Sequence, residues 1–277
     1  MTIQRYLTVA VLLLVFSPAM AEVEETQGAE VRSDEELERF LLEGKIIEAK
    51  SLGEGVTRPM KVTLEMNGST MRAAFKTVDI QERGVTRFDG APPEFNFSDR
   101  YQYERAAYLL DRHLGMNMAP VTVLRSWSGK RGAMIEWIEN AIDEGDRLKE
   151  KRVAPDPVHL KYQRSVMDLF DALISNADRN TGNQLITTDD WKLHLIDHSR
   201  TFRQIKKLPD RFLGQPVSLP RSLLERLEAL EEKSLRELLK GVASRSQVRA
   251  LLARRDKILE KIEADRKQYG DRMIFQD

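Results

Sequence analysis

The sequence predicts an α+β fold with two lobes, a small β-rich N-terminal lobe with antiparallel strands and a larger, mainly α-helical C-terminal lobe. Five strand-like runs lie within residues 45–138, with one helical segment among them. After His159, apolar residues recur mostly at helical spacing. Residues 141–158 are charged, contain two prolines and are predicted to be the linker between the lobes. A chain of 277 residues can bury a large core.

The composition excludes several classes of protein. The chain has no cysteine, which rules out disulfide-stapled scaffolds, cysteine-ligated metal proteins and thiol enzymes. Lys+Arg and Asp+Glu both number 44, so the formal net charge is 0. Because nucleic-acid-binding domains are usually strongly basic, no nucleic-acid partner is expected. A partner should instead be recognised by local chemistry.

The first 21 residues have the layout of a secretory signal peptide. Arg5 precedes an apolar run from Leu7 to Phe16, and Ala19-Met20-Ala21 forms a cleavage site. This run is about half as long as a bilayer-spanning helix, so no stable membrane span is expected. We expect cleavage near Ala21 and export to the periplasm or the exterior. The polar, acidic residues 22–32 are expected to form a flexible tail.

The N-terminal lobe, residues 33–140, is predicted to open with a helix and a three-stranded meander. The helix is predicted from Asp34 to Leu42, because acidic residues open it and Gly44 stops it. Asn67-Gly68 is a strong signal for a two-residue hairpin turn, which favours antiparallel pairing. The predicted strands are Lys45 to Ser51, Met60 to Met66 and Met71 to Val78.

A second helix and two more strands complete this lobe. A polar stretch with two glycines and two prolines leads to Ser98, the predicted N-cap of a helix that runs to Leu114 and ends at Gly115. The last strands are predicted from Ala119 to Ser126 and from Gly132 to Ile138.

The C-terminal lobe, residues 159–277, is predicted to be mainly helical. Val166 to Ile174 is apolar at helical spacing, and Leu193 to Ile196 is a short strand-like interruption. Residues from Pro220 to about Tyr269 form two predicted amphipathic helices. Their short heptad pattern favours packing onto a core over a coiled coil.

The most informative stretch leads from an apolar helix to Asp178, Asn183 and Asp197. Asp178 and Asn183 lie in a polar loop, and a short hairpin returns the chain to Asp197. Phosphoryl transfer needs one carboxylate to align the attacking hydroxyl, and an amide oxygen and a second carboxylate to hold Mg²⁺. Asp178 would be the first group, and Asn183 and Asp197 the metal ligands. Asp178 and Asn183 alone would fit a solvated turn equally well.

The N-terminal half supplies a cation for phosphates. Strand alternation puts Lys76 and Ala74 on one face. Glu104, on the following helix, shares a stripe with Tyr101 and Tyr108 and is expected to face the packed side, where it would fix the ammonium. Taken individually, a lysine that reaches solvent from a strand edge and a glutamate on a solvated helix face are commoner than a buried ion pair. Their order relative to the downstream residues favours an ion pair.

Two further segments are predicted to contact the nucleotide. Gly53 and Gly55 lie between the first two strands, where backbone N–H groups of a flexible turn would cover phosphates. A plain hairpin explains these glycines equally well. Glu136 and Ile138 end the last strand before the linker, where an adenine ring would meet backbone groups. Their assignment rests on position alone.

The motif Asn176-Ala-Asp178-Arg179-Asn-x-x-Asn183, followed by Leu-Ile-Asp197, resembles the kinase-like superfamily in its atypical branches. It looks most like the phosphatidylinositol-kinase-like group and the secretory-pathway kinases of the Golgi casein kinase and four-jointed type. The resemblance implies a two-lobed kinase-like fold that uses ATP and Mg²⁺. It also implies roles for five residues: Lys76 as the phosphate-binding lysine, Glu104 as its partner, Asp178 as the catalytic aspartate, and Asn183 and Asp197 as magnesium ligands.

Departures from the family pattern leave the substrate class open. His198-Ser199 stands where conventional kinases have Phe-Gly, and no activation loop is recognisable. The expected function is that of an exported, magnesium-dependent kinase acting on a hydroxyl of a protein or peptide. One alternative is a phosphotransferase for small molecules or lipid head groups. The other is a non-catalytic pseudokinase, a binding module that export favours because ATP is scarce outside a bacterial cytoplasm.

Overall fold

The computed structural model describes residues 32–53, 59–88, 91–176 and 178–276. Residues 33–277 form one compact unit, separate from residues 1–32. The predicted signal peptide therefore lies outside the described residues, as does the predicted tail up to residue 31. Across the described residues, no helix has both the length and the apolar character that crossing a bilayer requires.

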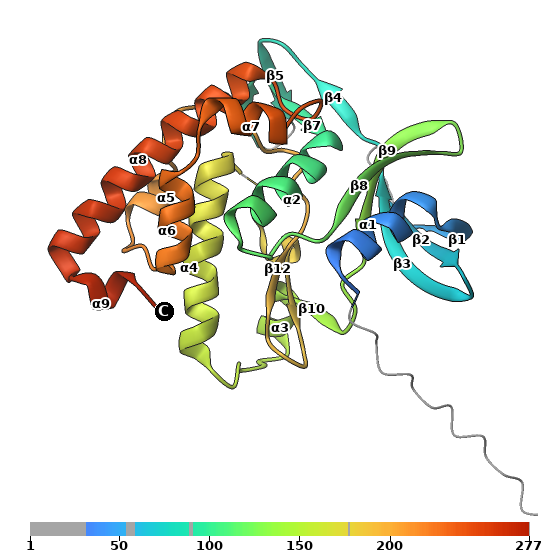
Figure 1. Ribbon diagram of the computed structural model, residues 1–277, viewed down its shortest axis with the longest axis horizontal. Coiled ribbons are helices and arrows are strands. Elements are labelled where there is room, and N and C mark those ends of the chain that lie inside the picture. Colours follow the sequence, from blue (N-terminus) through green and yellow to red (C-terminus); the bar gives the residue numbers. More distant parts are fainter. Residues whose placement is uncertain (1–31, 54–58, 89–90, 177, 277) are drawn as a thin grey trace, which may run out of the picture. The chain divides into compact units, whose positions relative to one another are not determined.

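An antiparallel five-stranded sheet, in the order β1-β2-β3-β9-β8, forms the smaller lobe (Figure 1). Helix α1 packs against β2, β8 and β9. The predicted meander and its turn are confirmed, since Asn67 and Gly68 connect β2 to β3 with φ angles of 54° and 78°. The bounds are α1 Asp34–Glu43, β1 Lys45–Ser51, β2 Met60–Met66, β3 Ser69–Lys76, β8 Thr122–Trp127 and β9 Lys130–Glu136.

Four short strands lie between β3 and α2, where the sequence predicted only a polar stretch. They form two ribbons, β4 with β7 and β5 with β6, and we call the described part of residues 79–100 the arm. The predicted N-cap at Ser98 is wrong, because Ser98 pairs with Gln81 in the first ribbon and α2 begins only after Tyr101. The bounds are β4 Asp79–Gln81, β5 Val85–Phe88, β6 Ala91–Phe95 and β7 Ser98–Arg100.

Helix α2, Gln102–Leu114, packs into both lobes (Figure 1). Tyr108 belongs to the core under the sheet, whereas Tyr103 belongs to the large core of the helical lobe. Gly115 ends the helix at φ 69°, a left-handed conformation that favours glycine. Because both cores hold α2, the side chain of Glu104 on this helix has a fixed position relative to each lobe.

The larger lobe is built around two long helices, α4 and α8, which pack against each other. A small antiparallel sheet in the order β10-β11-β12 contacts α4 through β12. The strands are β10 Ala141–Asp143, β11 Gln184–Thr187 and β12 Leu193–Leu195. The helices are α3 Glu144–Lys149, α4 Pro157–Ile174, the single 3₁₀ turn Thr181–Asn183, α5 Asp210–Leu213, α6 Arg221–Glu228, α7 Glu232–Leu238, α8 Arg245–Tyr269 and α9 Asp271–Ile274.

Two secondary-structure predictions are corrected. Residues 141–158 were predicted only as a linker, with no helix or strand assigned to them, but they contain β10 and α3, and β10 pairs along its length with β11. The lobe boundaries themselves stay a prediction. The region from Pro220 to Tyr269 contains three helices rather than two. Carbonyl groups of Leu227 and Leu230 at the end of α6 accept hydrogen bonds from Arg255 of α8, at 3.3 and 2.6 Å, which stabilises a break before α7.

His194 in β12 is expected to make stability depend on pH. Burial, with the nearby charge of Lys192, lowers the pKa of His194 from 6.5 to about 4. Between these pH values the unfolded chain binds a proton that the folded chain does not. The free energy of unfolding should therefore fall as the pH drops below 6.5, by up to about 1.4 kcal/mol per pH unit from this residue.

Denaturant unfolding across this pH range measures the effect. The His194→Gln variant should lose that share of the slope while keeping the contributions of the other groups. A variant with the same slope as the wild type would contradict this account of His194.

Candidate functional site

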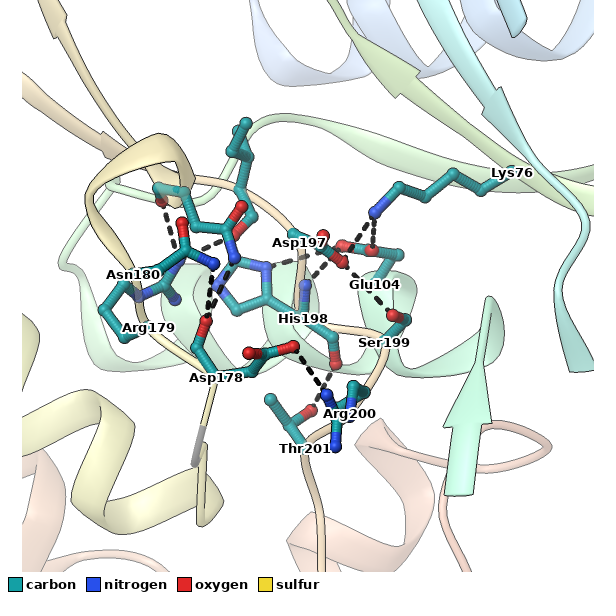
Figure 2. Close-up of polar contacts among 12 residues, drawn as sticks. Lys76, Glu104, Asp178, Arg179, Asn180, Asp197, His198, Ser199, Arg200 and Thr201 are labelled. Carbon is teal, nitrogen blue, oxygen red and sulfur yellow. Dashed lines mark hydrogen bonds and ion pairs between the residues drawn. The ribbon is translucent and has the colours of Figure 1, made fainter. Parts of the chain in front are cut away.

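Lys76, the last residue of β3, forms ion pairs with two carboxylates from distant parts of the chain (Figure 2). Its Nζ lies 2.8 Å from Oε1 of Glu104 and 2.8 Å from Oδ1 of Asp197, just after β12. The side chains of Lys76 and Glu104 are 16% and 3% exposed, whereas that of Asp197 is 41% exposed. The structure thus brings together three residues that the sequence placed in one site.

The alternation of β3 directs Lys76 into the site, as the sequence predicted. Ala73 and Phe75 are buried in the core, and Ala74 and Lys76 line a cavity. Gly132 of β9 approaches closely, since an added Cβ would lie 2.4 Å from the carbonyl oxygen of Lys76. A glycine at this point therefore lets β9 pack tightly against the end of β3.

Both carboxylate oxygens of Glu104 have partners. Oε1 accepts from Lys76, and Oε2 accepts from the backbone N–H of His198 at 3.0 Å. Burial alone would raise the pKa of Glu104, but the charge of Lys76 and the contact with His198 outweigh it and hold the pKa well below its ordinary value. Burial likewise would lower the pKa of Lys76, and the two carboxylates raise it above its ordinary value. Both groups are therefore charged at neutral pH.

Arg179 holds the loop that carries Asp178 and Asn183. Its Nε and Nη2 donate to the two carboxylate oxygens of Asp171 in α4, at 3.0 and 3.1 Å. Its Nη1 donates to the carbonyl oxygens of Asn183 and Ile196, at 2.8 and 2.6 Å. This guanidinium, 3% exposed, joins α4, the loop and the chain just before Asp197.

The contact between Arg179 and Asp171 was not predicted, although the sequence indicates it. Asp171 stands within the apolar run Val166 to Ile174. A carboxylate in a helix buried on that face requires a partner, and the following polar loop offers Arg179.

Asn183 connects the two halves of the site. Its Nδ2 donates to the carbonyl oxygen of Asp178 at 3.0 Å, which leaves the amide oxygen of Asn183 for another partner. Asn183 lines one cavity together with Lys76, Glu104 and Asp197. Asp178 lines a different cavity, so the predicted residues converge on two connected sites rather than on one cleft.

The two cavities differ in size and lining. The first, of about 320 Å³, is mostly apolar apart from the charged residues at Lys76, and Glu136 and Ile138 are among its lining residues. Their contact with an adenine ring stays a prediction. The second, of about 1010 Å³, lies against the arm and is mostly polar. Of the predicted glycines, Gly53 is not among the described residues that line the first cavity, although the adjacent Leu52 is. Gly55 lies outside the described residues.

Glu136 forms a reciprocal pair with Val121. The backbone N–H of Glu136 donates to the carbonyl oxygen of Val121 at 2.9 Å, and its Oε2 accepts from the N–H of Val121 at 3.1 Å. Burial raises the pKa of Glu136. The carboxylate therefore contributes to holding β9 in place, a role that position in the sequence did not suggest.

Asp99 of β7 is an acidic residue near the site that the sequence analysis missed. Its Oδ1 is buried and has no hydrogen-bond partner among the described residues. Burial raises the pKa of Asp99, and the charge of Asp197 acts in the same direction.

Solved structures with a similar fold include those of a hydra Fam20 and of a Golgi casein kinase, which confirms the predicted two-lobed kinase-like fold and its resemblance to the Golgi casein kinase type. A hydra Fam20 structure with sugar has a TM-score of 0.66 and 16% sequence identity, over 89% of this chain and 93% of that chain. A Golgi casein kinase has a TM-score of 0.62 and 17% identity, over 87% and 77%. The same kind of kinase with Mn/ADP bound gives 0.61 and 17%, over 87% and 78%. By sequence, the chain matches no family model and no curated protein.

Two substitutions test how Lys76 is held. Each carboxylate lies 2.8 Å from Nζ, but only Glu104 is buried. We expect Glu104→Gln to lower the free energy of unfolding by about 3 kcal/mol, because it leaves a buried charge with less compensation. The matched change Asp197→Asn should cost at most about 1 kcal/mol, since water screens the exposed pair. Denaturant unfolding compares them, and equal losses would contradict this difference.

Proposed function

We propose that the protein is an ATP-dependent phosphotransferase that transfers the γ-phosphate to a hydroxyl of a protein or peptide. The observation that carries the proposal is the convergence of Lys76, Glu104, Asn183 and Asp197 on one cavity. Asp178 is joined to this set through Asn183. A paired lysine, two metal-binding groups and a carboxylate for the acceptor are the parts that phosphoryl transfer requires.

The lining of the smaller cavity supports a nucleotide ligand. Ala74, Ile135, Leu185 and Ile196 provide apolar surface for an aromatic base, and Lys76 provides charge for phosphates. Its volume of about 320 Å³ is within the usual range for ligand sites, about 300–1,000 Å³. An ammonium has three donors, so Lys76 would serve a phosphate oxygen in addition to its two carboxylates.

The donor set also fits Mg²⁺. Asn183 donates its hydrogen bond through Nδ2, so its amide oxygen is available to a metal ion. Oδ1 of Asp197 accepts from Lys76 and Ser199, which leaves Oδ2 for the ion among the contacts of the described residues. Hard oxygen ligands of this kind suit Mg²⁺, which keeps waters and phosphate oxygens in its remaining positions. When bound, the ion would neutralise charge on the transferred phosphoryl group.

Asp178 would align the acceptor. Its Oδ2 pairs with Arg200 at 3.0 Å, and its side chain is 39% exposed, so Oδ1 is the oxygen that would accept the hydroxyl proton. The hydroxyl oxygen would then bond to the γ-phosphorus as the bond to ADP breaks. The hydrogen bond between Asn183 and the carbonyl oxygen of Asp178 would keep the acceptor-aligning group and the metal ligand at a fixed spacing.

A small-molecule acceptor is the second candidate. Gln81, Asn96, Gln204 and Gln247 line the cavity beside Asp178, and such side chains would hydrogen-bond a polyhydroxyl molecule. The hydra Fam20 structure, which is similar to this chain, is one with sugar. Incubation with labelled ATP and separate panels of peptides, sugars and lipid head groups would distinguish the two, because label should enter one class only.

We also propose that the mature chain is exported, on the support of the signal-peptide layout of residues 1–21. Amino-terminal sequencing of the protein recovered outside the cytoplasm should begin at Glu22. An uncleaved cytoplasmic chain would contradict export while leaving the chemistry untouched.

Nucleotide binding is expected to stabilise the protein. With Mg²⁺-ATP at 100 times its Kd, the free energy of unfolding should rise by about 2.7 kcal/mol. The increase should require Mg²⁺ and should be lost in Lys76→Met, which removes the ammonium. Thermal-shift titration measures this, and a wild-type protein that millimolar nucleotide does not stabilise would contradict the kinase proposal.

Asp178→Asn should separate turnover from binding. Turnover, measured as ADP release, should fall by about 10² to 10⁴, because the amide cannot accept the hydroxyl proton. Stabilisation by Mg²⁺-ATP should remain, since Asp178 is not among the described residues that line the nucleotide cavity. A variant with wild-type turnover would remove Asp178 from the proposed mechanism.

A further inference from the structure

A chain of ion pairs runs from the arm to the carboxylate of Asp178 (Figure 2 shows its inner end). Nη1 of Arg200 lies 3.0 Å from Oδ2 of Asp178, and Nη2 of the same guanidinium pairs with Oε1 of Glu94 in β6. The second oxygen of Glu94 pairs with Nη2 of Arg203 at 3.2 Å. One carboxylate from the arm thus binds two arginines of the segment that follows Asp197.

Other contacts hold the arm and this segment together. The backbone N–H of Arg100 in β7 donates to the carbonyl oxygen of Ser199 at 2.8 Å. The guanidinium of Arg200 lies over the ring of Phe97, 5.1 Å from its centroid. Arg200 is therefore fixed by an acid, an aromatic face and a neighbouring backbone contact, all from residues 94–100.

We propose, on the basis of the proposed function, that Arg200 is the positioning residue for the Asp178 carboxylate and that Glu94 acts through Arg200. The arm would then be part of the catalytic machinery as well as a wall of the acceptor cavity.

The Asp178 side chain would be free to rotate without Arg200. The aspartate side chain is 39% exposed and lies in a loop, so little packing fixes the direction of its carboxylate. Arg200 binds one oxygen and leaves the other for an acceptor. Arg200 is itself 32% exposed. A long side chain at this exposure keeps much of its conformational freedom unless a second contact also holds its guanidinium. Glu94 supplies that hold.

The arm is inserted between Lys76 and Glu104, the two members of the central ion pair. Phe95 and Asn96, which follow Glu94, line the same large cavity as Asp178. An acceptor that contacts these residues would therefore contact the arm, which determines the position of Arg200. Direct contacts thus connect the arm to Asp178: Glu94 of the arm binds Arg200, and Arg200 binds Asp178.

Kinetics test the positioning role. Arg200→Ala should lower kcat for ADP release by about 10²-fold, as expected for a misplaced reacting group, and leave KM for ATP unchanged. Arg200→Lys should fall in between, because it keeps the charge but cannot bridge both carboxylates in one plane. Glu94→Gln should also lower kcat, but the double variant should be no slower than Arg200→Ala alone. Fully additive losses, or a wild-type kcat in Arg200→Ala, would overturn the proposal.

Carboxyl labelling tests the same contacts without requiring turnover. Reaction with a carbodiimide and an amine, read by mass spectrometry, should modify Asp178 several-fold faster in Arg200→Ala and in Glu94→Gln than in the wild type. Arg245→Ala is the matched control, because it breaks an ion pair with Glu232 at 3.0 Å far along the chain and should leave the labelling rate of Asp178 unchanged. Unchanged labelling of Asp178 in both test variants would overturn the positioning role. If the variants show these labelling changes but the wild-type protein neither binds nor turns over ATP, the contacts that hold Asp178 are supported and the proposed function is refuted.

Discussion

The buried ion pair between Lys76 and Glu104 is the constraint on which the rest of the site depends. The two residues are 28 positions apart, and a second pair joins Lys76 to Asp197, 121 positions away. Glu104 is 3% exposed, so moving α2 away from β3 would leave charges unpaired where water does not reach them. The same helix packs into the cores of both lobes. The site therefore has its geometry set by the packing of the whole fold.

Arginines organise the polar half of the site. Arg179 is buried and joins α4 to the loop through Asp171, which gives this loop the rigidity that an exposed turn lacks. Arg200 lines the larger cavity and joins Asp178 to the arm. The two guanidinium groups therefore have different roles. Arg179 holds the backbone of the loop, and Arg200 contacts the Asp178 side chain that this loop presents.

Local patterns allowed part of this structure to be predicted from sequence. The turn at Asn67-Gly68 follows from the Asn-Gly hairpin signal, and the direction of the Lys76 side chain follows from the two-residue periodicity of a strand. The arm was missed because its strands have only three to five residues each and because glycines and prolines interrupt this stretch of sequence. Among the described residues, these strands pair only with each other. The contact between Arg200 and Glu94 spans 106 positions, and no local pattern encodes a pair at that separation. Residue type, spacing and order identified the groups that could do chemistry and the glutamate that holds Lys76. They did not identify Arg179 and Arg200, which hold the loop and Asp178.

The central claim is that Asn183 and Asp197 hold a metal over nucleotide phosphates that Lys76 binds. Crystals grown with ADP and Mn²⁺ test it most directly, because the anomalous signal of manganese locates the ion without reference to the rest of the density. The account predicts one manganese peak with the amide oxygen of Asn183 and a carboxylate oxygen of Asp197 in its coordination shell, and a phosphate oxygen on Nζ of Lys76. Manganese and nucleotide bound elsewhere, or bound without these three residues, would contradict it.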